Sequence, residues 1–262
     1  MYTIITVCLN AADDLEQTIQ SVLLQKDCEI EYIIKDGIST DHTMDVVRKY
    51  EPELQKLSRF VFVSEKDTGL YDAMNIATKM AQGSRLQFLN AGDCLMDENV
   101  IASVAANECD ADILYGDHTK MFGQAPVSKK TIRETDADFA RNLNFSHQAA
   151  FIKREVMQEL LYDTKYPICA DLEFFQRAYA LGKTYRYIDV MVVAFQMGGI
   201  SYQRAFDLLD ETYRIQYKYG IISETECIRL RKRNQLKKFS RQMIPASLYK
   251  KLKKWKFNKA QK

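Results

Sequence analysis

The sequence predicts an α/β protein with a mostly parallel central sheet flanked by helices, followed by a helical C-terminal extension. In the first hundred residues, β-branched and aromatic runs alternate with amphipathic stretches. Strict alternation of this kind is typical of parallel strands joined by right-handed crossovers. The apolar runs also end in Asn or Asp, often beside glycine, and open α/β sheets bind ligands at the carboxyl ends of their strands. An enzyme site at that edge is therefore the leading hypothesis.

The first half contains four expected strands with three helical patterns between them. In the first helical pattern, Leu15, Ile19 and Val22 recur at helical spacing, which predicts one buried face. The strands are Tyr2–Leu9, Glu31–Lys35, Arg59–Ser64 and Arg85–Leu89, and the helices are Asp13–Gln25, Thr40–Tyr50 and Leu70–Gln82.

The second half has a less regular pattern. The segment Gly116–Asn142 is polar and weakly periodic, so we expect a mobile loop there, and the chain is mostly helical from Ser201 onward. The expected strands or extended segments are Ile113–Tyr115, Ala149–Ile152 and Tyr185–Phe195, and the expected helices are Arg154–Leu161 and Asp171–Leu181.

The composition is that of a soluble globular protein. With 262 residues, of which 47% are hydrophobic, the chain can bury a sizeable core. No apolar run reaches the roughly 18 residues that span a bilayer, and the N-terminus lacks the pattern of a secretory signal. The six cysteines have no close paired spacing. We therefore expect reduced thiols in a cytosolic protein rather than disulfides or a zinc site.

The net charge of +2 conceals a strong asymmetry. Residues 229–262 carry 14 Lys/Arg and no Asp/Glu, so residues 1–228 carry 23 basic and 35 acidic groups, a net charge of −12. A basic end of this kind predicts attraction to a polyanion, either a membrane surface or a nucleic acid.

Asp36 follows the second expected strand and is itself followed by Gly37. A carboxylate at this position can accept hydrogen bonds from a base N–H or a ribose hydroxyl, and glycine lets a ligand approach the backbone. The alternative is a simple turn in which Ser39 or Thr40 caps the next helix.

Asp67 and Asp72 flank the beginning of the third expected helix, where Asp72 and Asn75 share one face. Helix N-termini favour anions, yet two acidic groups would repel a diphosphate. Asp67 or Asp72 therefore fits a sugar or nucleoside hydroxyl better. The alternative for Asp72 is an acid in the first turn that the helix dipole stabilises.

Asn90 and Asp93 lie in a glycine turn after the fourth expected strand. Mg²⁺ or Mn²⁺ needs only one or two protein carboxylates when phosphate oxygens and water complete its shell. Asp93 is therefore a candidate metal ligand, with a plain turn as the alternative.

Together these segments resemble family-2 glycosyltransferases, which have the nucleotide-sugar-binding glycosyltransferase-A fold. The resemblance covers roughly residues 2 to 195 and rests on Thr3–Asn10, Ile19–Gln25, Ile33–Asp41, Gly69–Asn75, Gly83-Ser84 and Phe88–Asp93. It implies a nucleotide site that includes Thr6, Asn10, Asp36, Asp67, Asp72 and Asn90.

The chain departs from this family at the metal motif, which is Asp-any-Asp. Its first carboxylate is Asn90 here and its second aligns with Gly92, so that Asp93 lies one place later. A subset that looks like capsule and colanic-acid enzymes shares this variant. The resemblance thus implies a divalent metal, Mn²⁺ or Mg²⁺, with Asp93 as a ligand.

Asp171 matches the general base that the family carries in a Glu-Asp pair, although Ala170 replaces the Glu. A carboxylate that takes the acceptor's proton contributes roughly 10²–10⁴-fold to the rate, and a helix cap is the alternative role. Glu173 is the substitute candidate and, with Gln148, a candidate acceptor-binding residue. His147 is expected to bind the metal or a donor phosphate, or else to be structural.

The basic tail predicts an amphipathic helix that lies in a membrane interface. Leu252 and Trp255 share one face with Leu248, and Lys250 and Lys251 lie beside it. A nucleic acid is the less favoured partner because no nucleic-acid fold motif occurs, and packing of this end on the domain is a further alternative.

The expected protein is an inverting glycosyltransferase at the inner face of the plasma membrane. It would move sugar from a UDP- or GDP-sugar to a saccharide or polyprenyl-linked acceptor in cell-surface polysaccharide synthesis. We expect a catalytic domain at 1–200, with its nucleotide half at 1–95 and its acceptor half at 96–200, and a helical extension at 201–262. A sugar-phosphate nucleotidyltransferase is one alternative, although Asn10–Asp14 is neither glycine-rich nor basic; a non-catalytic membrane-associated module is another.

Overall fold

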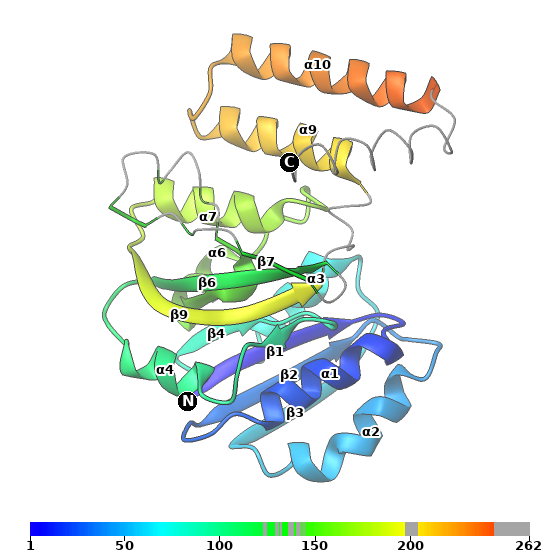
Figure 1. Ribbon diagram of the computed structural model, residues 1–262, viewed down its shortest axis with the longest axis vertical. Helices are drawn as coiled ribbons and strands as arrows, with labels where there is room; N and C mark the ends of the chain where they lie inside the picture. Colours follow the sequence, from blue (N-terminus) through cyan, green and yellow to red (C-terminus); the bar gives the residue numbers. More distant parts are fainter. Residues whose placement is uncertain are drawn as a thin grey trace. The chain divides into compact units, whose positions relative to one another are not determined.

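The computed structural model describes residues 1–122, 125–128, 131, 133–135, 139, 143, 145–196 and 204–243. The chain divides into two compact units, Met1–Tyr202 and Gln203–Lys262. In the described part of the first unit, a nine-stranded sheet has the order β3-β2-β1-β4-β8-β6-β9-β5, with β7 beside β6. Helices cover both faces of this sheet (Figure 1).

The N-terminal half is a parallel sheet, as the alternating pattern predicted. Cys8, Asp36 and Ser64 are register partners across three neighbouring strands, so these strands end at one edge of the sheet. The strands are β1 (Tyr2–Cys8), β2 (Ile30–Asp36), β3 (Arg59–Ser64) and β4 (Arg85–Phe88), and the helices are α1 (Ala12–Leu23), α2 (Thr43–Leu54) and α3 (Leu70–Thr78).

Both faces of the sheet are buried, which explains why its strands are continuous apolar runs. Successive side chains of a strand point to opposite faces, so Ile4 packs with the cluster around α1 and α2. Ile5 packs with the opposite cluster, which includes residues of α3, α6 and α7. The predicted apolar face of α1 is buried, with Leu15, Ile19 and Val22 at 0% exposure.

The second half adds antiparallel strands and further helices. Strand β8 is antiparallel to β4, with Leu86 opposite Ile152, so the chain enters β8 at the edge where β4 ends. The remaining elements are β5 (Cys94–Leu95), α4 (Val100–Ala106), β6 (Ile113–Phe122), β7 (Ala125–Ser128), η1 (His147–Ala149), β8 (Ala150–Lys153), α6 (Arg154–Leu160), α7 (Ala170–Ala180) and β9 (Tyr185–Gln196).

The prediction of a loop over Gly116–Asn142 is wrong for residues 116–122 and 125–128, which form strands. Strand β6 continues to Phe122 and pairs with β9, and β7 follows it. The pairing register shifts on both sides of Asp117, which disturbs the alternation that sequence reasoning relies on. Gly116 permits this close approach, because a Cβ there would lie 2.5 Å from the Val190 carbonyl oxygen.

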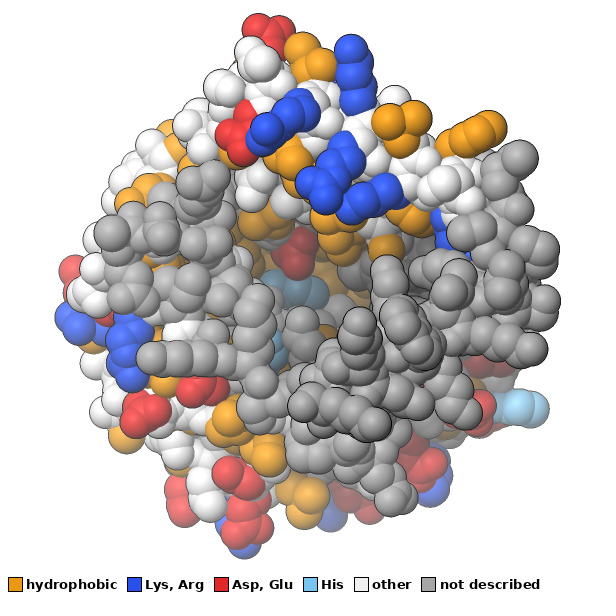
Figure 2. Space-filling model, turned by 45° about the horizontal axis from the view of Figure 1, so that its top comes forward, with side chains coloured by type: hydrophobic (Ala, Val, Ile, Leu, Met, Phe, Trp, Pro, Cys, Tyr) orange, Lys and Arg blue, Asp and Glu red, His pale blue; other side chains and the backbone are white. Residues whose placement is uncertain are grey.

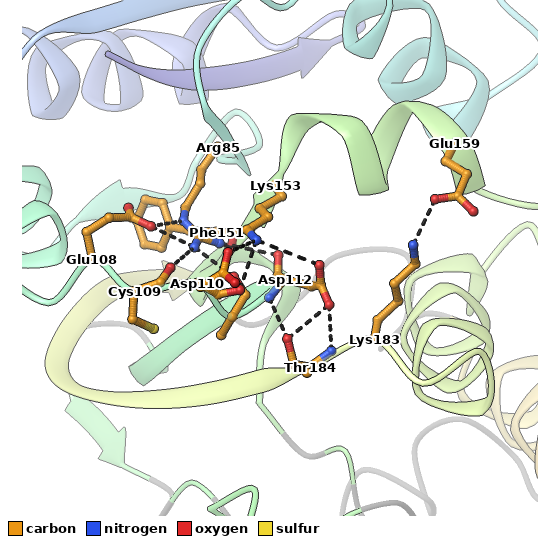
Figure 3. Close-up of polar contacts among 11 residues, drawn as sticks. Arg85, Glu108, Cys109, Asp110, Asp112, Phe151, Lys153, Glu159, Lys183 and Thr184 are labelled. Carbon is orange, nitrogen blue, oxygen red and sulfur yellow. Dashed lines mark hydrogen bonds and ion pairs between the residues drawn. The ribbon is translucent and has the colours of Figure 1, made fainter.

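The edge of the sheet opposite the strand ends is held by Arg85, whose side chain is 1% exposed (Figure 3). Its guanidinium donates to Glu108 and to the carbonyls of Cys109 and Ala111 at 2.7–2.8 Å. Lys153, its register partner, pairs with Asp110 at 2.7 Å. The charged groups of Arg85 and Lys153 thus have partners within the protein, so we assign this cluster to stabilising the fold.

The described part of the second unit is a helical hairpin of α9 (Ala205–Lys218) and α10 (Glu224–Met243). Two ion pairs join the helices, Arg231 with Asp210 and Lys238 with Asp207, both at 2.7 Å. The predicted membrane residues Lys250, Lys251, Leu252 and Trp255 lie outside the described residues.

None of the described helices is long and apolar enough to cross a bilayer. None of the six cysteines, all of which lie among the described residues, forms a disulfide.

Candidate active site

The predicted site residues follow strands that end side by side. Asn10 comes after β1, Asp36 ends β2, and Asn90 follows β4, all on one edge of the parallel sheet. His147 begins η1, which leads directly into β8, and β8 begins at the same edge because it is antiparallel to β4. The topology therefore collects side chains that are more than a hundred residues apart in the sequence.

Asp36 is a buried carboxylate that the protein satisfies by itself. It accepts hydrogen bonds from the Ser39 backbone N–H at 3.0 Å, from the Ser39 hydroxyl, and from the Ser64 hydroxyl at 2.6 Å. Burial raises the pKa of Asp36, but these hydrogen bonds outweigh burial and hold the pKa below its usual value. Asp36 is thus a fixed anion at the strand end.

Asn10 ties the end of β1 to the loop that follows Asp36. Its φ of 50° is left-handed, and its Oδ1 accepts a hydrogen bond from the Thr40 backbone N–H at 2.9 Å. Thr6, in contrast, is completely buried. Its Oγ1 lies 2.9 Å from the Tyr32 hydroxyl and donates to the Leu89 carbonyl at 2.7 Å. Asp36 is as completely buried as Thr6, and for both residues a contact with a nucleoside stays a prediction.

Lys35 is a completely buried lysine that sequence reasoning missed. Its Nζ donates to the Asp36 carbonyl at 2.8 Å, the Glu65 carbonyl at 2.6 Å and Asp67 Oδ2 at 2.8 Å. The ammonium group therefore fixes the loop after β3, with Asp67, against the end of β2. A single lysine inside an apolar strand, directly before the candidate Asp36, was the available signal.

Asp72 stabilises the beginning of α3. Its Oδ2 accepts hydrogen bonds from the Thr68 N–H at 2.8 Å and the Thr68 hydroxyl at 2.9 Å. Asn75, on the same helix, exchanges two hydrogen bonds with the backbone of Tyr162. The structure thus gives both residues structural contacts, which matches the alternative considered for Asp72.

The Asp93 carboxylate accepts fewer hydrogen bonds from the described residues than the Asp36 carboxylate does. It is 7% exposed, and its Oδ2 accepts a hydrogen bond from Gln148 Nε2 at 3.1 Å. Burial raises the pKa of Asp93 to about 7, only partly opposed by Gln148 and His147. The site therefore holds a carboxylate whose negative charge the protein leaves largely uncompensated.

His147 and Tyr71 both contact Asp171. His147 Nδ1 lies 3.1 Å from Asp171 Oδ2, and the Tyr71 hydroxyl donates to Asp171 Oδ1 at 3.0 Å. Burial raises the pKa of Asp171, but the hydrogen bonds from His147, the Leu172 N–H and Tyr71 bring the pKa below its usual value. The side chain of Asp171 remains 28% exposed, so part of it is accessible.

Asn90 lies in the same turn as Asp93 and beside His147, which contacts Asp171. Its Nδ2 lies 3.5 Å from His147 Nε2, while its Oδ1 is buried and has no hydrogen-bond partner in the described part of the chain. An orphaned amide oxygen in the same turn as a poorly satisfied carboxylate suits a hard cation.

The described residues contain no cluster of three or more His, Cys, Asp or Glu side chains that could hold a metal. A divalent ion shared with a diphosphate needs only one or two protein carboxylates. Asp93 with Asn90 fits that requirement.

Glu173 lies away from this group. It is completely buried and forms an ion pair with Arg177 Nη2 at 3.3 Å. Because α-helical residues turn by 100° each, a side chain two positions after Asp171 points to another side of α7. This burial argues against the acceptor-binding role expected for Glu173.

A family model described as Glycosyl transferase family 2 matches residues 3–165. The chain belongs to glycosyltransferase family 2. A PGL/p-HBAD biosynthesis glycosyltransferase of Mycobacterium tuberculosis is 32% identical to this glycosyltransferase over 211 residues, 77% of this chain and 79% of the relative. The family confirms the predicted enzyme class and sets aside the nucleotidyltransferase and the non-catalytic module.

Two solved structures share the fold of this glycosyltransferase. Staphylococcus aureus TarS 1-349 in complex with UDP-GlcNAc has a TM-score of 0.68 at 16% identity, covering 91% of this chain and 72% of TarS. The mannosyltransferase PcManGT of Pyrobaculum calidifontis, in complex with GDP-Man and Mn²⁺, has a TM-score of 0.65 at 17% identity, covering 85% and 65%. These likenesses confirm the predicted glycosyltransferase-A fold.

Proposed function

We propose that this glycosyltransferase performs an inverting transfer from a nucleotide-diphospho-sugar to a saccharide or polyprenyl-linked acceptor in cell-surface polysaccharide synthesis. The observation that carries the proposal is Asp171, a partly exposed carboxylate that His147 and Tyr71 hold in place. UDP and GDP are the proposed nucleotides because the solved neighbours hold UDP-GlcNAc and GDP-Man.

Each part of the donor has a suitable group at the sheet edge. Asp36 and Asp67 accept hydrogen bonds from the nucleoside, and Asn10 shapes the loop beside them. The diphosphate lies toward Asn90 and Asp93. Asp171 takes the proton of the acceptor hydroxyl while that oxygen attacks the anomeric carbon and the nucleoside diphosphate leaves. A positioned base of this kind contributes roughly 10²–10⁴-fold.

Asp93 and Asn90 are the residues that would hold a divalent metal, with Mn²⁺ or Mg²⁺ as candidates. A bound ion would neutralise charge on the departing diphosphate. His147 has its Nδ1 engaged with Asp171, so a phosphate or a metal would meet its Nε2, which now lies 3.5 Å from Asn90 Nδ2. Gln148 donates a hydrogen bond to Asp93 and so positions that carboxylate. We also propose that Gln148 contacts the acceptor, as the sequence predicted.

The proposed place of action is the cytoplasmic face of the plasma membrane, with peripheral attachment. The support is the basic C-terminal sequence, which includes Lys250, Lys251, Leu252 and Trp255. Amphipathic basic segments bind anionic membrane surfaces without spanning them.

Substitution of the proposed base tests this function most simply. Asp171→Asn keeps the shape of the side chain but cannot accept the proton. On a panel of UDP-, GDP- and dTDP-sugars, we expect transfer to fall by about 10²-fold or more while nucleoside diphosphate affinity is retained. Asp110→Asn is the matched control, since Asp110 is exposed at the opposite sheet edge. Unchanged turnover in Asp171→Asn would reject the assignment.

A further inference from the structure

The outer face of α10 exposes large apolar side chains at helical spacing. Ile228, Leu236 and Phe239 are 46%, 70% and 63% exposed. At 100° per residue these three positions fall within one quarter of the helix circumference, and Lys232 lies among them. We call these four residues the α10 face.

The α10 face is turned away from α9. The contacts with α9 come from the other side of α10, where Arg231 and Lys238 pair with Asp210 and Asp207. Asn234 on that side is 5% exposed and donates to the Phe206 carbonyl at 2.7 Å. The hairpin therefore buries one side of α10, and no described residue of its own unit covers the α10 face.

Positive charge lies within the α10 face and along one side of it. Lys232, Arg233 and Lys237 are exposed and form no ion pair among the described residues. The sequence after α10, residues 244–262, adds seven lysines and no acidic residue. Figure 2 shows Lys and Arg side chains beside hydrophobic ones on the surface that the C-terminal helices form.

We propose that the α10 face docks on an anionic lipid surface. An amphipathic helix with lysine and arginine beside exposed leucine and phenylalanine binds in the headgroup region of a bilayer, where apolar side chains leave water and basic groups meet lipid phosphate. A nucleic acid would match the charge but would offer no apolar layer for Leu236 and Phe239. This inference rests on the proposed membrane location. It assigns membrane contact to α10, in addition to the C-terminal tail that the sequence predicted to bind the membrane.

Vesicle binding of the full chain tests this inference. Sedimentation with phosphatidylcholine vesicles, with and without phosphatidylglycerol, measures the partition of wild type and two variants. One variant, Leu236→Gln with Phe239→Gln, removes apolar groups; the other, Lys232→Gln, Arg233→Gln and Lys237→Gln, removes charge. We expect wild type to bind the anionic vesicles only, and each variant to bind them at least about tenfold more weakly.

The matched control is Leu24→Gln with Met96→Gln, because these apolar residues of the first unit are 61% and 47% exposed. It should bind vesicles as wild type does. Transfer to a soluble acceptor should be unchanged in the α10 variants, so a failure of membrane docking is distinguishable from a failure of the proposed activity.

Three results would overturn the inference. One is wild type that ignores anionic vesicles, and another is α10 variants that bind them with wild-type affinity. The third is a wild-type dimer that becomes monomeric in the Leu236→Gln and Phe239→Gln variant, which would show that the face joins two copies of this chain. Far-ultraviolet circular dichroism checks that each variant keeps its helices.

Discussion

Asp36 and Asp93 are both buried carboxylates beside the same edge of the sheet, yet their surroundings act in opposite directions. Asp36 receives hydrogen bonds from Ser39 and Ser64, and its pKa lies below the usual value. Asp93 receives one from Gln148, and burial raises its pKa to about 7. The described residues thus stabilise the charge of Asp36 with several hydrogen bonds, whereas they stabilise the charge of Asp93 only weakly.

This difference separates two ways of building a binding site. The proposed nucleoside end is preorganised, because hydrogen bonds from Ser39 and Ser64 fix the Asp36 carboxylate before any ligand arrives. The diphosphate end, in our account, is completed by the ligand, since a bound cation would supply the positive charge that Asp93 lacks.

The largest expected effect is that of Asp93→Asn. The amide keeps the contact with Gln148 but removes the negative charge that would hold a cation. We expect kcat/KM for transfer to fall by about 100-fold or more, since even indirect support of a metal is worth about 10–100-fold. Titration with a nucleoside, which lacks the diphosphate, should show unchanged binding. A variant with wild-type kcat/KM would contradict a ligand-completed site.

A smaller effect is expected for Asp36→Asn. The new amide would present N–H groups to donors that now bind the carboxylate. Hydrogen bonds to charged groups are worth about 1.5–3 kcal/mol, and about 1.4 kcal/mol corresponds to a tenfold change in affinity. Calorimetric titration should therefore show nucleoside affinity reduced about tenfold or more. Unaltered affinity would mean that the Asp36 network serves only the fold.

Lys35→Met should affect binding more than chemistry. Methionine fills the buried space but releases the loop that carries Asp67, so we expect the donor KM to rise by about tenfold, comparable to losing one charged hydrogen bond, with little change in kcat. Lys26→Met is the matched control, because Lys26 is an exposed lysine paired with Glu98. An equal fall in kcat and kcat/KM would place the effect in the chemical step instead.

The smallest effect is a pH dependence of stability in chelator-treated protein. The folded pKa of Asp93, about 7, lies above its ordinary value, so its stabilising contribution is present at low pH and lost as the pH rises through about 7. Asp36 acts in the opposite sense, since its lowered pKa stabilises the fold above its ordinary pKa and this is lost as pH falls. Between about pH 5 and pH 8, the melting temperature of Asp93→Asn should fall less than that of wild type. Parallel curves would contradict the raised pKa.

Local sequence patterns predicted the parallel half of the fold and the residues at its strand ends. Asn10 and Asn90 are recognisable because each directly follows an apolar run, and Asp36 follows such a run after Lys35. Strand β6 beyond Tyr115 was missed because its register shifts.

The contacts of the site were harder to predict than its positions. The pairing of Tyr71 with Asp171 joins residues a hundred positions apart, and no local pattern encodes it. The burial of Glu173 depends on how α7 packs, which its sequence alone does not determine.

A crystal structure with a nucleoside diphosphate and Mn²⁺ tests most directly whether one donor lies across both environments. We predict the nucleoside against Asp36, the manganese anomalous peak bonded to Asp93 and the diphosphate, and Asp171 facing the space beyond the β-phosphate. Manganese bound away from Asp93, or a nucleoside that does not touch Asp36, would contradict the account.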